Sequence, residues 1–173
     1  MSIPSVQLRP EEPGDVGAIT EVIDAAFQTA AESRLVVALR EAGALSVSLV
    51  AATEERIVGH VALSPVAVNG ITAGQRWLGL APLAVLPEWQ RRGIGADLVQ
   101  AALAIAGARQ AALVFVLGRP SYYDRLGFEA ATPLGWRCIY EVPEPAFRVH
   151  RLADGHRSPP PGTVTYHPAF DAL

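Results

Sequence analysis

One stretch in the middle of the chain constrains the fold more than any other. Residues 76–86 (RWLGLAPLAVL) are typical of a strand, and residues 96–110 carry apolar side chains at helical spacing. Residues 111–118 (AALVFVLG) then form a continuous apolar run, which is typical of a strand covered on both faces. The stretch therefore predicts a strand–helix–strand unit, which crosses over right-handed and leaves two parallel neighbours in one sheet.

The segments before this unit predict two helices followed by an antiparallel hairpin. In chain order they are a strand at 5–13, helices at 14–27 and 31–43, and strands at 45–53 and 56–68. Asp15 stands where a capping residue is expected, and Gly43 stands where the second helix should stop. A charged turn at 53–56 joins the two strands, and a turn at 69–75 leads into the central unit.

Beyond residue 118 the patterns are shorter. They are a short helix at 121–127, further strand material at 128–132, 136–147 and 162–170, and a proline-rich connector at 156–163. Adjacent prolines make such a connector stiff and extended, so it should carry the chain to a closing C-terminal strand. We expect residues 1–173 to form a single domain in which helices pack on a mixed α/β sheet.

Composition excludes several classes of partner. With 50% apolar and 18% charged residues the chain fits a compact globular protein. A net charge of −3 argues against a nucleic-acid surface, and no apolar stretch approaches the ~20 residues of a membrane span. The N-terminus lacks the basic start and apolar run of a secretory signal. We therefore expect a soluble, cytoplasmic protein without nucleic acid or membrane as a partner.

Two residue counts exclude particular kinds of site. All 14 basic residues are arginine, so a Walker-type phosphate loop, which needs lysine, is excluded. Cys138 is the only cysteine, which rules out an internal disulfide and a cysteine-rich metal site, and we predict no metal. Cys138 could be an acylated nucleophile, but a small buried apolar role is the expectation we favour.

The strongest functional signal lies in residues 86–98 (LPEWQRRGIGADL), between the central strand and its helix. The first N–H groups of a helix have no partner within it, and the helix dipole makes that end positive. Gly93 and Gly95 let the backbone approach a ligand closely. Arg91 and Arg92 add forked, permanently charged donors. The pattern predicts an anion site, which together with the two arginines could hold a diphosphate.

Two other interpretations of this loop stay open. The glycines could simply allow a helix to start, with both arginines solvated. A dinucleotide site would need a third glycine where Leu98 stands. It would also need an acidic residue about 20 positions further on, where the sequence is apolar. Both departures disfavour the dinucleotide interpretation.

Residues 90–95, QRRGIG, resemble the Q/R-x-x-G-x-G/A signature of the GCN5-related N-acetyltransferase (GNAT) superfamily, whose members bind acetyl-coenzyme A. Further along, YYDRLGF resembles the family's Y-x-x-x-G-F signature. The segments GHVALSPV and GTVTYHPAF are similar to a bacterial subgroup, the YhbS-like predicted acetyltransferases. The resemblance covers nearly the whole chain. It implies a GNAT-like fold with a central, mostly antiparallel sheet, one splayed parallel pair of strands, and helices on both faces.

The resemblance also implies a set of coenzyme contacts. Pyrophosphate would lie on the amides of Arg92, Gly93, Ile94, Gly95 and Ala96, with Gln90 and Arg91 beside them, and pantetheine would pair with Leu83, Ala84 and Val85. Independently of the family, Pro82 forfeits a ladder donor, which indicates a bulge or an opening edge in this strand. The family often has an asparagine before its tyrosine; here the segment is GRPSYY, so Arg119 or Ser121 would take its place.

Acetyl transfer from a thioester to an amine needs a neutral amine, donors for the oxyanion and a proton for the departing thiolate. The resemblance makes Tyr123 the general acid, with Tyr122 as the adjacent alternative. A phenol can pass its proton to a thiolate held within hydrogen-bond reach. The N–H of Leu83 or Ala84 is expected to meet the oxyanion.

The general base is not assigned by the sequence. Residues 76–86 hold no carboxylate, although many relatives have a glutamate on this strand. His60 has a suitable intrinsic pKa, and Glu88 lies beside the glycine loop. A chain of water molecules is the third candidate.

We therefore expect an N-acetyltransferase that moves an acetyl group from acetyl-CoA, as cosubstrate, to a primary amine by direct transfer in a ternary complex. The alternatives are a non-catalytic coenzyme A sensor or interaction module, and transfer to a hydroxyl or of a longer acyl group. We expect the acceptor to be a small-molecule or peptide amine, whose identity the sequence does not specify. Glu32 and Arg34 could recognise it or could simply be solvated helix charges. The resemblance also allows a homodimer formed through strands near the C-terminus.

Overall fold

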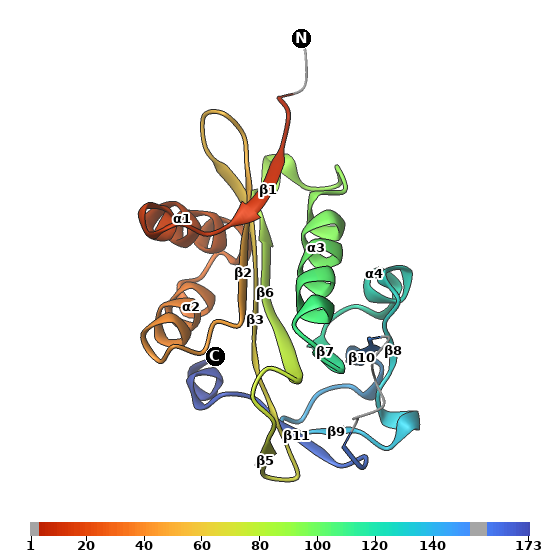
Figure 1. Cartoon of the computed structure of the whole chain (residues 1–173). Helices are drawn as coiled ribbons and strands as arrows, with labels where there is room; N and C mark the ends of the chain where they lie inside the picture. Colours follow the sequence, from red (N-terminus) through yellow and green to blue (C-terminus); the bar gives the residue numbers. More distant parts are fainter. Residues whose placement is uncertain (1–3, 153–158) are drawn as a thin grey trace.

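A seven-stranded mixed sheet crosses the molecule and carries helices on both faces (Figure 1). The structure, a computed structural model, describes residues 4–152 and 159–173. In spatial order the strands are β1 (Gln7–Pro10), β2 (Val47–Ala52), β3 (Ile57–Pro65), β6 (Trp77–Val85), β7 (Leu113–Leu117), β10 (Phe147–Arg151) and β8 (Glu129–Ala130). The neighbours β6 and β7 run parallel, and the other neighbouring pairs run antiparallel. The predicted mixed sheet with one parallel pair is confirmed.

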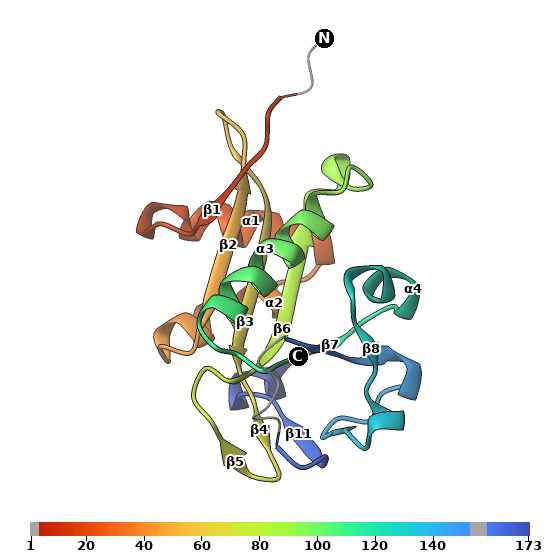
Figure 2. The same cartoon turned by 45° about the vertical axis from the view of Figure 1, so that its right-hand side comes forward.

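Helices α1 (Val16–Phe27) and α2 (Ala31–Glu41) cover one face of this sheet, and α3 (Ile94–Ala108) covers the other (Figure 1). The short helix α4 (Pro120–Tyr123) and the 3-10 turn η3 (Asp124–Leu126) follow β7. Figure 2 shows α4 standing apart from α3, beside β8. The predicted strand–helix–strand unit is therefore present as β6, α3 and β7.

Asp15 occupies the N-cap position of α1, as predicted, but its side chain does not cap the helix. Residues Pro13–Asp15 form a 3-10 turn, and α1 begins only at Val16. The Asp15 carboxylate makes no capping bond to that helix. It lies 2.6 Å from an Arg9 guanidinium nitrogen and accepts the N–H of Glu12 at 2.7 Å. A nearby arginine therefore competes successfully for the capping oxygen.

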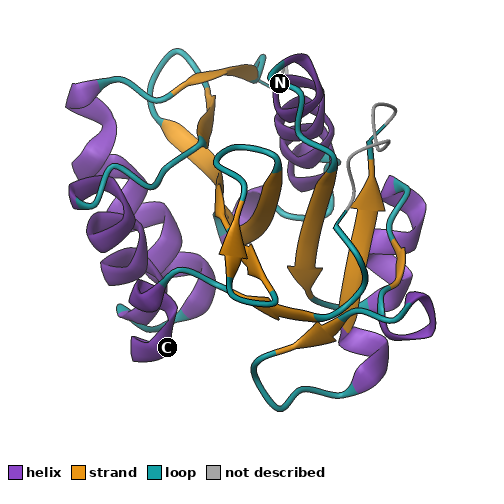
Figure 3. Ribbon diagram, turned by 60° about the horizontal axis from the view of Figure 1, so that its bottom comes forward, coloured by secondary structure: helices purple, strands orange, loops and turns teal. Residues whose placement is uncertain are grey.

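A second, four-stranded sheet joins segments that are far apart in the sequence. Its order is β5 (Ile71–Thr72), β4 (Ala67–Val68), β11 (Thr163–Thr165) and β9 (Arg137–Cys138). Strands β4 and β5 form a hairpin through Asn69 and Gly70, whose φ angles are 51° and 76°. The sequence pattern predicts only a turn at residues 69–75, so strand β5 is a correction to it. Figure 3 shows the end of the chain, after β11, beside the N-terminal helices.

Two predicted strands near the C-terminus have the wrong extent. Of residues 136–147, only Arg137–Cys138 pair within a strand before prolines lead into the 3-10 turn η5 (Glu144–Ala146), and β10 then starts at Phe147. Of residues 162–170, pairing stops at Thr165, and Pro168 opens the 3-10 helix η7 (Pro168–Ala172). Proline cannot donate to a ladder, which explains both interruptions. The predicted connector, 156–163, begins with residues that lie outside the described ranges.

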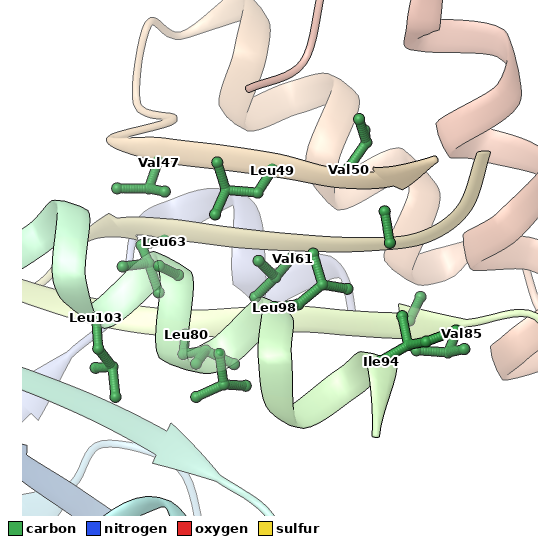
Figure 4. Close-up of a cluster of buried hydrophobic side chains, with 14 of the residues drawn as sticks. Val47, Leu49, Val50, Val61, Leu63, Leu80, Val85, Ile94, Leu98 and Leu103 are labelled. Carbon is green, nitrogen blue, oxygen red and sulfur yellow. The ribbon is translucent and has the colours of Figure 1, made fainter. Parts of the chain in front are cut away.

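The core beneath α3 fixes the start of this helix on the sheet (Figure 4). Leu98 is fully buried and lies against Gly59 of β3, where a Cβ would sit 3.0 Å from the leucine methyl. Ile94 and Leu103 of the same helix are buried in this cluster too. Burying one leucine contributes about 1.5–3 kcal/mol. The glycine loop that precedes α3 is thus held at the end of β6 by packing on its C-terminal side.

Candidate active site

Strands β6 and β7 pair only over the first part of β6. Their register runs from Trp77 opposite Leu113 to Leu80 opposite Val116 and then ends. Beyond Leu80, β6 stays paired with β3 as far as Val85. Within the described ranges, the side of β6 that faces β7 therefore has no strand partner after Leu80. This opening is the predicted splay between the parallel strands.

A bulge accompanies the opening, as Pro82 indicated. Between two matched pairs with β3, β6 carries one residue more than its neighbour, at Ala81 and Pro82. The peptide bond between these residues is cis. Since a bulge turns the following side chains to the other face, Leu83 and Val85 lie near Gly95 of α3.

The alternation of hydrogen bonds along β6 shows which of its backbone amides face β3 and which face the opening. Leu86 donates to Val58 of β3 at 2.9 Å. Because the bonds of an antiparallel strand alternate, Ala84 also turns its backbone groups toward β3, while Leu83 and Val85 turn theirs toward the opening. The Val85 carbonyl indeed accepts the Gln90 side-chain amide at 3.0 Å. Of the two N–H groups predicted for the oxyanion, this alternation favours Leu83.

The glycine loop ends in a row of free amides. The chain leaves β6 through the 3-10 turn η2 (Pro87–Trp89), and both Arg91 (φ 60°) and Gly93 (φ 84°) adopt left-handed conformations. In the part of the chain that the structure describes, the N–H groups of residues 91–96 donate to no carbonyl. Asp97 is the first to find one, the Gly93 oxygen at 2.9 Å. Free amides at the positive end of a 15-residue helix form a site for an anion.

The polar side chains of the loop hold its own shape. Arg92 donates to the Glu88 carbonyl at 2.9 Å and lies over the Trp89 ring, 5.0 Å from its centre. The Glu88 carboxylate pairs with Arg56 at 2.7 Å and is exposed. A hydrogen bond to its own backbone and the Arg56 contact lower the pKa of Glu88. Glu88 is thus an exposed, paired carboxylate at the outer end of the loop.

Two tyrosines from α4 reach the opening. A Cβ at Gly95 would lie 2.6 Å from the Tyr122 hydroxyl oxygen, so this hydroxyl sits directly on the loop end of α3. A Cβ at Gly118 would overlap the Tyr123 ring, which covers the end of β7. The two rings meet edge to face at 5.0 Å.

The two phenols differ in burial. Tyr123 is 8% exposed, and burial raises its pKa well above the usual range, so the phenol keeps its proton at physiological pH. Burial also raises the pKa of Tyr122, which is half-buried. Sequence spacing favoured Tyr123 alone, whereas the structure places the Tyr122 hydroxyl nearer to the amide row. Arg119 and Ser121 are exposed on either side of Pro120.

His60 is fully buried on β3, opposite Ala84 of β6. Its Nε2 lies 2.8 Å from the Ser48 hydroxyl, which donates to Glu11 at 2.5 Å, and Arg40 donates to both carboxylate oxygens of Glu11. Because the single hydroxyl proton goes to Glu11, Nε2 must carry the imidazole proton and Nδ1 the lone pair. Burial lowers the pKa of His60 to about 4. An imidazole with that pKa is a weak proton acceptor.

Other predicted candidates lie away from the opening. Burial raises the pKa of the Cys138 thiol, which packs against the buried cluster that includes Phe115 and Trp136. The thiol is therefore not a thiolate nucleophile in the resting protein. Arg34 is exposed and lines a groove of about 400 Å³ between α1 and α2. Glu32 stands at the start of α2. Neither helix residue contacts the amide row.

In residues 4–152 and 159–173, no three His, Cys, Asp or Glu side chains gather closely enough to hold a metal ion. Among the helices of those same ranges, none combines the length and apolar character that crossing a bilayer requires.

The chain is similar to known proteins over much of its length. Residues 44–130 match the family described as acetyltransferase (GNAT) domain. The uncharacterized N-acetyltransferase YhbS of Escherichia coli (strain K12) is 39% identical over 165 residues, 95% of this chain and 98% of the relative.

Two solved structures of similar proteins contain the coenzyme. Escherichia coli YhbS in complex with CoA has a TM-score of 0.91 and 38% identity, covering 99% of this chain and 94% of that one. A GNAT family acetyltransferase from Brucella melitensis in complex with acetyl-CoA has a TM-score of 0.82 and 34% identity, covering 98% and 100%. From its sequence, its fold and these relatives, the chain belongs to the GNAT family of N-acetyltransferases.

Proposed function

We propose that this protein transfers an acetyl group from acetyl-CoA to a primary amine, directly and within a ternary complex. One observation carries the proposal: the row of free amides at residues 91–96 lies at the end of a strand whose next neighbour has splayed away. A diphosphate on those amides places the rest of the coenzyme along the open side of β6. The amide groups of pantetheine would then replace the missing strand.

The coenzyme is held chiefly by backbone groups. The amides of Arg92–Ala96 bind the pyrophosphate, and Gln90 keeps the loop in place through its bond to Val85. Leu83 offers its N–H and C=O groups and Val85 its N–H to the pantetheine arm, while Ala84 supplies its side chain to the strand surface. Arg91 adds charge, and Ser121 lies at the outer end of α4. The helix dipole contributes about 0.3–1 kcal/mol to anion binding at an exposed site.

The chemistry is divided between this strand and α4. The amine nitrogen attacks the thioester carbon, and the N–H of Leu83 stabilises the oxyanion. The C–S bond breaks, and Tyr123 donates its proton to the sulfur. With no carboxylate on β6 and His60 held neutral by burial, the amine loses its surplus proton to water.

Calorimetric titration with acetyl-CoA, CoA and NAD tests the ligand class, and thiol release in the presence of primary amines tests transfer. We expect both coenzyme A species, and not NAD, to bind and to raise the melting temperature through mass action. Amine-dependent thiol release would separate the enzyme from a non-catalytic coenzyme A sensor. The absence of any acetyl-CoA binding would overturn the proposal.

A further inference from the structure

Tyr166 lies against β6 one residue before the strands part. It follows β11 near the end of the chain, and its ring fills the space over Gly79, where a Cβ would lie 2.5 Å from Cε1. Gly79 pairs with Phe115 of β7, and the last pair before the opening is the next one, Leu80 with Val116. A side chain at Gly79 would displace the tyrosine ring.

The Tyr166 hydroxyl is buried and has no hydrogen-bond partner within the described part of the chain. The residue is 5% exposed. The rings of Phe170 and Tyr140 pack beside it at 5.0 and 6.1 Å, and the Tyr140 hydroxyl is already bonded to Asp171. A buried hydroxyl that lacks a hydrogen-bond partner destabilises the folded protein by itself. A bound ligand that hydrogen-bonds to the hydroxyl would account for its presence here.

Tyr166 and Tyr123 approach the opening from opposite faces of the sheet. Tyr166 packs in the same cluster as Phe115, whereas Tyr123 covers Gly118. Side chains alternate along β7: Val114 and Val116 pack in the buried cluster that holds Tyr123, whereas Phe115 packs in the other cluster with Tyr166. Burial raises the pKa of Tyr166, and repulsion by Cys138, Tyr140 and Tyr123 adds to the rise, so the hydroxyl keeps its proton.

The two faces of the sheet therefore present different residues to the opening. The amide row, Tyr122 and Tyr123 lie on the α3 side. The opposite side is formed by α2 and by the C-terminal segment 163–173. This segment contacts α2 through η7 and contains Tyr166. In the proposed function the coenzyme arm fills the opening from the α3 side, which leaves the Tyr166 side for a second substrate.

We propose that Tyr166 contacts the acceptor, and that its hydroxyl oxygen accepts a hydrogen bond from the attacking amine. This inference rests on the proposed function. In the reaction the nitrogen lone pair forms the C–N bond, the C–S bond breaks, and the thiolate takes the Tyr123 proton. The nitrogen releases its surplus proton to solvent, which restores Tyr123. Tyr166 gains and loses no proton; it directs the nitrogen lone pair at the carbonyl carbon.

The substitution Tyr166→Phe tests this role, with Tyr140→Phe as the matched control. Hydroxylamine serves as the acceptor probe because it is small and has a neutral nitrogen at pH 7. Tyr166→Phe should lower kcat/KM for hydroxylamine about tenfold, the effect of one lost hydrogen bond to substrate. The dissociation constant for acetyl-CoA should not change. The melting temperature should stay equal or rise, because the variant removes an unpaired buried hydroxyl.

Tyr140→Phe, which removes a neighbouring hydroxyl that has its own partner, should retain the kcat/KM of the unmodified protein. An unchanged kcat/KM for Tyr166→Phe would overturn the inference, as would an equal loss in both variants. If the unmodified protein fails to bind acetyl-CoA in the calorimeter, the proposed function itself fails. The coenzyme titration therefore separates the two failures.

Discussion

The hydroxyl oxygen of Tyr122 occupies the place that a side chain at Gly95 would take. The distance from that oxygen to a Cβ built on Gly95 is 2.6 Å, well inside van der Waals contact. The contact ties α4 to the first turn of α3, so the tyrosine pair and the amide row are positioned together. Gly95 has an ordinary helical backbone, which means that its contact with Tyr122, and not its φ angle, requires glycine.

We therefore expect Gly95→Ala to weaken acetyl-CoA binding about tenfold, since the tyrosine must move away from the loop. Removing the hydroxyl as well, in Gly95→Ala/Tyr122→Phe, should restore much of the affinity because the overlap is with that oxygen. Calorimetric titration measures both. Gly107→Ala in the same helix is the control: its Cβ would meet only a Leu152 methyl at 3.8 Å. It should leave binding unchanged and stabilise the protein by about 1 kcal/mol. Equal losses in the single and double variants would contradict this account.

Tyr123→Phe should lower kcat about 100-fold or more, the usual effect of removing a general acid. The ring contacts with Gly118 and Phe128 persist in the variant, so its melting temperature and its affinity for acetyl-CoA should stay close to those of the unmodified protein. Thiol-release kinetics at saturating coenzyme provide the measurement. If Tyr123→Phe turns over at full rate while Tyr122→Phe does not, the proton donor is the neighbouring phenol.

The parts of the site that could be predicted are those with local signals. The strand, glycine loop, helix and second strand are contiguous in sequence, and the left-handed φ of Gly93 is one that glycine adopts without strain. Pro82 indicated the bulge because proline has no backbone N–H to donate to a neighbouring strand. The identities of residues 90–95 carried the family resemblance.

The contacts that could not be predicted join distant segments. Strand pairs of two residues, as in β4 with β11 and β9 with β11, depend on partners elsewhere in the chain and leave no periodicity of their own. Tyr166 against Gly79, and Tyr122 against Gly95, are packing contacts between elements that only the fold brings together. The alternation of hydrogen bonds along β6 that distinguishes Leu83 from Ala84 likewise depends on the register with β3.

The His60 network predicts that stability falls on acidification. The pKa of His60 is about 4 in the folded protein against 6.5 for an ordinary histidine, so the unfolded chain binds the extra proton between these values. The contribution of His60 to the free energy of unfolding is fully present above pH 6.5. It is lost as the pH falls toward 4, and the loss is at most about 3 kcal/mol. The stability that Glu11 contributes is lost at lower pH than that of His60. Burial raises the pKa of the Glu11 carboxyl, but hydrogen bonds from Arg40 and Ser48 lower it, and the net effect is a lowered pKa.

Urea denaturation at pH 7.0, 6.0 and 5.0 measures this dependence above the range of Glu11. His60→Gln should be less stable at pH 7.0 but should show a flatter dependence between pH 7.0 and 5.0. A proton NMR titration of the unmodified protein provides an independent check, since the His60 ring should not titrate above pH 5. A His60 midpoint near 6.5 would mean that the imidazole is not buried in neutral form.

At Gly93 the backbone angle alone should control the effect of substitution. Its φ is 84°, and a Cβ built there meets nothing within 4 Å, so a side chain has room but an unfavourable conformation. Gly93→Ala should cost about 1 kcal/mol in stability and should weaken acetyl-CoA binding, because the loop relaxes away from the geometry that aligns its amides. Gly93→Asn should be milder in both respects, since asparagine enters the left-handed region more readily than alanine. Denaturation midpoints and calorimetric dissociation constants for the two variants give the ranking. If the larger asparagine side chain were the more damaging, space around the loop would matter more than its φ angle.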